Sequence, residues 1–121
     1  MSRYLVINDM DIADVETPVF GGRYAEESDY RNLLEDMQKL FEEFETTGTV
    51  KAPEYDHIDD IPLKRKDQSC YDNFMRTFIS TANRVTVRKG LDGRFYPVTD
   101  GFHRLYVAKK NGLKILVCVV N

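Results

Sequence analysis

Several features that mark particular protein classes are missing from this 121-residue sequence. It contains two cysteines, too few for the disulfide framework of a small secreted domain. No run approaches the roughly 20 apolar residues of a membrane-spanning helix, and no secretory signal peptide opens the chain. Internal repeats and low-complexity segments are absent as well. With 42% hydrophobic and 12% aromatic residues, the composition instead predicts a folded cytoplasmic domain with a core of its own.

Net charge is also low, at −3, but it is unevenly distributed along the chain. Residues 1–62 hold 16 acidic against 5 basic side chains, whereas residues 63–121 hold 4 acidic against 12 basic ones. A net negative charge argues against a protein built mainly to bind nucleic acid non-specifically. We expect the two halves to neutralise each other within one fold. The alternative is a basic rim around a bound phosphate, drawn from Lys64, Arg65, Lys66, Arg76, Arg84, Arg88, Arg94 and Arg104.

The second half of the sequence predicts the order strand, turn, strand, helix, strand over residues 84–120. Alternation of valine with polar residues at 85–88 predicts a half-buried strand, and the glycine and aspartate residues of 90–93 predict a hairpin turn. Residues 94–98 resume an extended pattern. The aliphatic segment 113–120 is typical of a strand buried on both faces of a sheet. The apolar face of the intervening helix is expected to comprise Phe102, Leu105, Tyr106 and Ala108.

The start of that helix carries the residues with the clearest chemistry. Asp100 is expected to cap the helix, and Gly101 lacks the Cβ that would obstruct a ligand's approach to the backbone. His103 can donate from a ring nitrogen, and Arg104 can clamp an anion with two hydrogen bonds. Unpaired N–H groups and the helix dipole also favour an anion at this end. This run predicts a phosphate site; the structural alternative is a capped turn followed by a solvated arginine.

The run Asp-Gly-Phe-His-Arg-Leu-Tyr-Val-Ala-Lys-Lys-Asn-Gly-Leu, residues 100–113, resembles a signature of the ParB/sulfiredoxin superfamily, ParB-like nuclease domain type. That signature reads Asp-Gly-x-His-Arg, then Ala-x-x, then Gly-Leu, and the similarity covers residues 84–121. It implies one small α+β domain over residues 1–121, with a mixed sheet, packed helices and a C-terminal strand-helix-strand unit. It also implies binding of ATP, ADP or CTP, with Mg²⁺. The nucleotide-binding residues carried over from the motif are Asp100, Gly101, Phe102, His103 and Arg104.

Two departures from the family pattern restrict the reaction that the resemblance implies. Sulfiredoxins have a reactive cysteine immediately before the motif histidine, where this chain has Phe102; Cys70 and Cys118 lie elsewhere. Sulfinic acid reduction is therefore disfavoured. The partitioning proteins' Glu-Arg-Arg form of the motif is absent, so a preference for CTP is not carried over. Their DNA-reading domain would follow this region, and a full partitioning protein is not expected because the sequence ends at Asn121.

The amino-terminal half predicts structure more clearly than function. Residues 4–7 read as a strand, and a strongly amphipathic helix is expected from Ser28 or Asp29 to about residue 45. A further helix is expected to begin at Ser69. Acidic residues gather beside His57 in the connection 53–66, but no second histidine lies at a ligand-like spacing. We therefore predict no metal site there. The apolar stripe of the first helix comprises Tyr30, Leu33, Leu34, Met37, Leu40, Phe41 and Phe44.

The leading functional hypothesis is a nucleotide- or phosphate-binding domain with possible phosphoryl-transfer or hydrolytic activity. Such reactions depend on positioning and charge stabilisation, usually with Mg²⁺, which Asp100 or an acid between Asp9 and Asp14 would hold. No residue is singled out as the catalytic base. One alternative is a non-catalytic protein-interaction module that keeps the fold and uses the helix at 30–44. The other is a nucleic-acid-processing protein, whose binding would depend strongly on salt.

Overall fold

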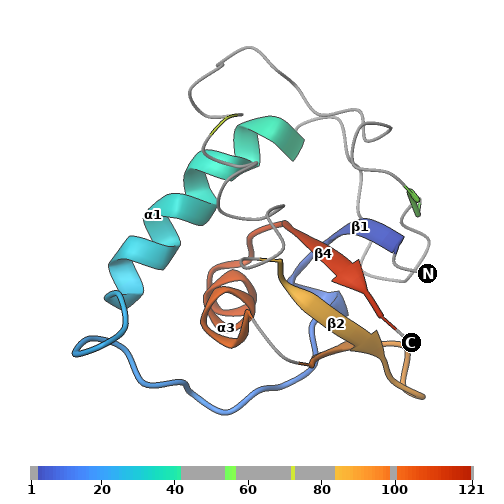
Figure 1. Ribbon diagram of the computed structural model, residues 1–121, viewed down its shortest axis with the longest axis horizontal. Helices are drawn as coiled ribbons and strands as arrows, with labels where there is room; N and C mark the ends of the chain where they lie inside the picture. Colours follow the sequence, from blue (N-terminus) through green and yellow to red (C-terminus); the bar gives the residue numbers. More distant parts are fainter. Residues whose placement is uncertain (1–2, 42–53, 57–71, 73–83, 99–100, 121) are drawn as a thin grey trace.

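The structure, a computed structural model, describes residues 3–41, 54–56, 72, 84–98 and 101–120. These residues form a small α+β domain in which two α-helices pack on a four-stranded mixed sheet (Figure 1). The α+β class and the C-terminal strand-helix-strand order predicted from the sequence are confirmed. The described elements are β1 (Arg3–Ile7), η1 (Asp9–Asp11), α1 (Glu27–Met37), η2 (Gln38–Phe41), β2 (Thr86–Lys89), β3 (Phe95–Pro97), α3 (Phe102–Asn111) and β4 (Ile115–Val119).

The four strands lie in the order β1-β4-β2-β3. Strand β4 pairs antiparallel with β1 and parallel with β2, while β2 and β3 form an antiparallel hairpin. The hairpin turn forms as predicted: Gly93 adopts a φ of 82°, and the Gly90 N–H donates to the Arg94 carbonyl at 2.7 Å. Parallel strands cannot be joined by a tight turn. The chain therefore returns from the hairpin through α3 before it enters β4.

Strands β1 and β4 are buried on both faces, as the aliphatic sequence of β4 predicts. Four consecutive residues of β4, Ile115 to Cys118, are each at most 3% exposed, and those of β1 from Leu5 to Ile7 are 1% exposed. Burial of each such side chain contributes about 1.5–3 kcal/mol relative to exposure. Cys118 of β4 is a buried free thiol.

The first helix is shorter than the sequence pattern predicts, and it ends in a contact with the sheet. Helix α1 gives way at Gln38 to the 3₁₀ turn η2. The Gln38 side-chain amide donates to the Lys114 carbonyl at 2.8 Å, and its oxygen accepts the Lys114 N–H at 2.9 Å. Gln38 also donates to the carbonyl of Leu34 at 2.8 Å. One side chain thus pairs with the backbone just before β4 as a neighbouring strand would.

Several predictions from the sequence fall outside the described residues. The continuation of the first helix to Phe44, the acidic connection around His57 and, apart from Asp72, the helix expected from Ser69 all do so. Within the described part of the chain, the apolar stripe of α1 and η2 packs into the core, where Leu34, Met37, Leu40 and Phe41 are buried. No helix of this part is long and apolar enough to cross a membrane.

Helix α3 packs on the sheet largely by the predicted face, since Leu105 and Ala108 are buried and Tyr106 is partly buried against the core. Leu105, Val107 and Ala108 are fully buried, but Phe102 is 44% exposed, so its assignment to the buried face was wrong. The first turn packs inward through Gly101 and Arg104, and this leaves the Phe102 side chain on the solvent side. The long segment 13–26 between η1 and α1 passes beneath α3 in the view of Figure 1.

Candidate functional site

The predicted phosphate motif begins at the junction between strand β3 and helix α3. Strand β3 ends at Pro97 and α3 begins at Phe102, and residues 99 and 100 between them lie outside the described residues. The N-cap position falls on Gly101 rather than on Asp100, which corrects the expectation of an acidic cap. The Gly101 carbonyl accepts the N–H of Leu105 at 2.9 Å, the first hydrogen bond of the helix.

Gly101 has a structural reason to be glycine. Its φ of 96° is left-handed, a conformation that L side chains rarely adopt. A Cβ built on Gly101 would lie 2.7 Å from Cγ1 of Val85, just before β2. Glycine at this position therefore permits close packing of the helix start against Val85. The sequence had suggested instead that it permits the approach of a ligand.

The next two residues offer hydrogen-bond donors. Among the described residues, the backbone N–H groups of Phe102 and His103 have no hydrogen-bond acceptor. Both belong to the first turn of α3, where N–H groups have no partner within the helix and the dipole is positive. Two adjacent donors at this end of a helix are the arrangement that binds phosphate or carboxylate oxygens.

The His103 side chain has a partner of its own. Its Nε2 lies 2.8 Å from the carbonyl oxygen of Val19, and because a carbonyl only accepts, Nε2 carries the proton. The imidazole stacks on Tyr30 at 5.3 Å between ring centroids, and it contacts Tyr24 and Phe20 at 4.7 and 5.4 Å. The sequence suggested His103 as a phosphate donor; in the fold its side chain fastens the segment 13–26 over the start of α3.

Arg104 differs from both sequence-based expectations of its surroundings. The residue is buried, at 8% exposure, so it is not the solvated side chain of the structural alternative. It is also not among the residues that line the hollow beside it. Its predicted role as an anion clamp stays a prediction, and it would require the guanidinium to act from beneath the surface.

A hollow of about 590 Å³ opens beside the start of α3. Its size is in the range of small-molecule sites. Three segments contribute: the loop after η1, the end of β3 and the first turn of α3. The lining residues are Val15, Glu16, Thr17, Pro18, Tyr96, Pro97, Phe102 and His103. Two of the five residues predicted for the site therefore lie in one hollow, together with six that the sequence did not indicate.

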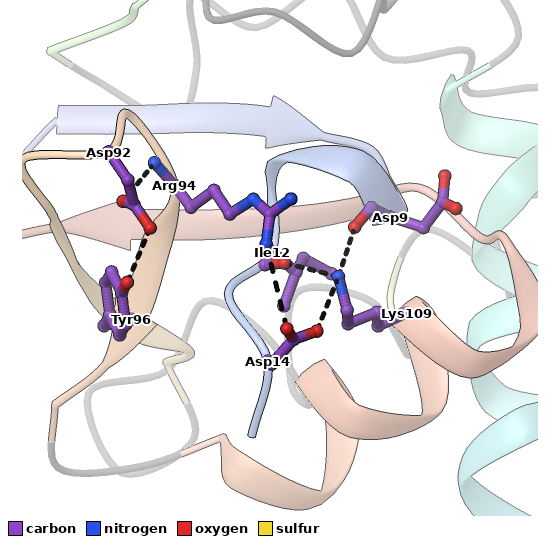
Figure 2. Close-up of polar contacts among 7 residues, drawn as sticks. All are labelled: Asp9, Ile12, Asp14, Asp92, Arg94, Tyr96 and Lys109. Carbon is purple, nitrogen blue, oxygen red and sulfur yellow. Dashed lines mark hydrogen bonds and ion pairs between the residues drawn. The ribbon is translucent and has the colours of Figure 1, made fainter.

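Tyr96 is held in place by the hairpin that precedes it. Its hydroxyl donates to Asp92 Oδ2 at 2.6 Å, and Asp92 Oδ1 accepts the Arg94 N–H at 3.0 Å (Figure 2). The hydrogen bond from Tyr96 is the main cause that lowers the pKa of Asp92, with a further contribution from the Arg94 N–H. The same bond to Asp92 raises the pKa of Tyr96 above its ordinary value.

This pair predicts a late-titrating tyrosine. The absorbance change on tyrosinate formation is compared between the parent protein and Tyr96→Phe. The component that the variant lacks belongs to Tyr96, and it should titrate above a phenol's usual pKa of about 10. Because the folded-state pKa is raised, the bond's contribution to stability is complete below the ordinary phenol pKa and is lost as pH rises through the raised value. Replacing Asp92 with Asn should bring this component back toward the ordinary range. Titration of the Tyr96 component with the other tyrosines in the parent protein would contradict the hydrogen bond.

The wall of the hollow formed by the segment after η1 is anchored by Lys109 of α3. Its Nζ donates to the carbonyl of Ile12 at 2.7 Å and to that of Asp9 at 3.3 Å (Figure 2). Asp14 lies between two cations, 3.6 Å from Lys109 and 3.8 Å from Arg94. Backbone pairing adds to this, since the Ala13 N–H donates to the Phe95 carbonyl at 2.9 Å. The position of residues 15–18 is thus determined by α3 and β3 together.

Three ion pairs among the described residues join the two halves and support their mutual neutralisation, while the pairs of Arg3 with Glu54 and of Arg31 with Glu35 lie within the first half. Arg94 and Lys109 pair with Asp14, and Lys110 pairs with Glu27 at 2.9 Å. Each joins a base of the second half to an acid of the first. Four members of the proposed basic rim, Lys64, Arg65, Lys66 and Arg76, lie outside the described residues. The other four, Arg84, Arg88, Arg94 and Arg104, are described, and none of them lines the hollow.

Two of the acids expected to hold Mg²⁺, Asp11 and Asp14, have other contacts in the fold. Asp11 is buried and accepts the Asn8 N–H at 3.3 Å, while Asp14 is paired as described above. Asp100 lies outside the described residues. Among the residues that line the hollow, Glu16 carries a carboxylate. Within the described part of the chain, no three His, Cys, Asp or Glu side chains gather as metal ligands do.

Comparisons with known proteins identify no relative: no protein-family model, curated protein or solved structure matches the chain.

Proposed function

We propose that this protein binds a phosphorylated ligand, most simply a nucleotide, in the hollow beside α3. The observation that carries the proposal is the pair of N–H groups of Phe102 and His103, which have no acceptor among the described residues and belong to residues that line the hollow. A phosphate placed there would gain two hydrogen bonds and the positive end of the helix dipole. The apolar part of the lining, formed by Val15, Pro18, Tyr96 and Pro97, suits a nucleoside better than a free ion.

The proposal includes membership of the ParB/sulfiredoxin superfamily, on the strength of the motif at 100–113. Its support is the placement of the motif between β3 and α3, with its Phe102 and His103 at the hollow. The ligands this suggests are ATP, ADP or CTP, with Mg²⁺ held in part by Glu16. Bound Mg²⁺ would neutralise phosphate charge, which matters because no lysine or arginine of the described residues lines the hollow.

Any reaction at this site is a further step of the same proposal. Phosphoryl transfer and hydrolysis both need a group to orient or deprotonate the attacking oxygen. Because Nε2–H is donated to Val19, any proton acceptance by His103 would fall to Nδ1. The paired N–H groups bear on binding alone, so binding without turnover is the part of the proposal with the stronger support.

A thermal-shift screen tests the proposal directly. ATP, ADP, CTP and GTP are each added at millimolar concentration, with and without Mg²⁺. A ligand that binds only the folded state stabilises it by about 2.7 kcal/mol at a hundredfold excess over Kd. We expect a nucleotide-dependent rise in Tm that exceeds the rise with adenosine. Equal behaviour with and without every nucleotide would remove the proposed function.

One observation favours a second candidate, a protein-interaction module. The hollow has few polar groups, and exposed apolar side chains lie at or near it, with Phe102 at 44% and Val19 at 71% exposure. Exposed apolar surface that is rimmed by polar residues often marks a protein contact. This module would bind a partner without nucleotide, and Phe102→Ser would abolish capture of that partner. The third hypothesis, nucleic-acid processing, has less support than these two. It needs basic side chains that are available to a phosphate backbone, and among the described residues Arg94, Lys109 and Lys110 are paired with acids.

A further inference from the structure

Two exposed aromatic side chains border the hollow from different elements. Tyr96 of β3 is 42% exposed, and Phe102 of α3 is 44% exposed. An aromatic ring in this position presents an apolar face that a planar ligand can cover. The sequence motif included Phe102 but gave no indication of Tyr96, because the two belong to different elements that only the fold brings to one hollow.

Tyr96 is fixed although it is exposed. Its hydroxyl is bonded to Asp92, and Asp92 is bonded in turn to the Arg94 N–H (Figure 2). Its ring also lies against Gly90, where an added Cβ would collide with the ring carbons Cε2 and Cδ2. A ring already held in one orientation loses little conformational entropy when a ligand stacks on it.

We propose that Tyr96 is the platform on which the planar base of the nucleotide stacks, while the phosphates occupy the N–H groups of Phe102 and His103. This inference rests on the proposed function and deepens it. Val15, Pro18 and Pro97 line the same hollow and offer no side-chain hydrogen bonds to the edge of a base. Of the polar side chains in the lining, Glu16 would hold Mg²⁺ and the Thr17 hydroxyl lies 3.4 Å from that of Tyr106. Recognition by stacking tolerates every base, because every base has a π face. The site should therefore take purine nucleotides somewhat more tightly than pyrimidine nucleotides and discriminate weakly within each class.

The experiment compares two probes on the full chain. ATP carries a base and a triphosphate, whereas inorganic tripolyphosphate carries the phosphates alone, and calorimetry gives the affinity of each in the presence of Mg²⁺. Tyr96→Leu is expected to weaken ATP binding by about tenfold or more, as loss of one stacked base does, and to leave tripolyphosphate binding unchanged. Tyr96→Phe is the matched control, since it keeps the ring and should retain most of the affinity for ATP.

The outcomes separate this inference from the proposed function. Binding of ATP and tripolyphosphate with equal affinity, unchanged ATP affinity in Tyr96→Leu, or equal losses for both probes would overturn the platform. Failure of the parent protein to bind either probe would overturn the proposed function as well. If Tyr96→Leu does not fold, Tyr96→Gln tests the platform again, because it removes the ring but keeps a polar side chain beside Asp92. A selective loss of ATP affinity in this variant supports the platform, and an unchanged ATP affinity overturns it.

Discussion

Replacement of Gly101 with alanine is expected to destabilise the fold by about 2–4 kcal/mol, the combined cost of a left-handed backbone and of an overpacked contact. The backbone φ of 96° and the 2.7 Å approach of a Cβ to Val85 act together, because relaxation of one would displace the start of α3 from the sheet. Urea denaturation followed by circular dichroism gives the free energy of unfolding. The same substitution should also reduce nucleotide affinity, because it would displace the backbone N–H groups of Phe102 and His103, the two residues that follow Gly101 in the chain.

Gly112 provides a matched control at the other end of α3. It also has a left-handed φ, of 63°, but a Cβ there would meet no atom within 4 Å. Gly112→Ala should therefore lower the free energy of unfolding only by the cost of the left-handed backbone, about 1 kcal/mol. Equal losses for the two variants would show that contact with Val85 does not determine the position of the helix.

Substitution of Lys109 by methionine is expected to cost about 1.5–3 kcal/mol, the range for hydrogen bonds to a charged group. Its ammonium group, on a side chain only 28% exposed, is bonded to the carbonyl oxygens of Ile12 and Asp9 and lies near Asp14. Methionine keeps the apolar length of the side chain but leaves those carbonyls without their donor. Faster amide hydrogen exchange in residues 13–18 should accompany the loss, because Lys109 anchors the segment that leads into the hollow.

The neighbouring Lys110 allows the same substitution in a different setting. Its ammonium pairs with Glu27 at 2.9 Å, and both side chains are largely exposed to solvent. Exposed pairs of this kind contribute about 0–1 kcal/mol, so Lys110→Met should change the free energy of unfolding little. If Lys110→Met costs as much as Lys109→Met, the carbonyl contacts are not what anchors the segment.

Local sequence patterns predicted much of the fold because they report on local structure. Alternation in β2, the Asp-Gly turn and the aliphatic run of β4 each depend on neighbours within a few residues. The junction of β3 and α3 was also predicted, and with it the site of the motif. Within the described residues, the first helix changes at Gln38 to the 3₁₀ turn η2, where the Gln38 side chain pairs with Lys114, a residue distant in sequence that the local pattern did not indicate.

The parts of the site that the sequence did not predict depend on long-range contacts. His103 was read as a phosphate donor, but Val19 and Tyr30 occupy its side chain, and nothing in the local pattern connects them. Arg104 was read as either a clamp or a solvated residue, and its burial arises from packing of α3. Tyr96 enters the site because the segment after η1 runs parallel beside β3 and pairs with it at Phe95. The Asp-Gly turn before Tyr96 predicted the hairpin, but nothing in the local sequence indicated that Tyr96 would lie beside a ligand site.

The most direct test of the central claim is a titration of ¹⁵N-labelled protein with ATP and Mg²⁺, followed at individual amides. The account predicts that the Phe102 and His103 amide signals shift in a saturable manner, as N–H groups do when they acquire a phosphate acceptor, while those near Gly112 stay in place. A titration that saturates elsewhere and leaves both signals unmoved, or one that moves no signal at all, would contradict the account.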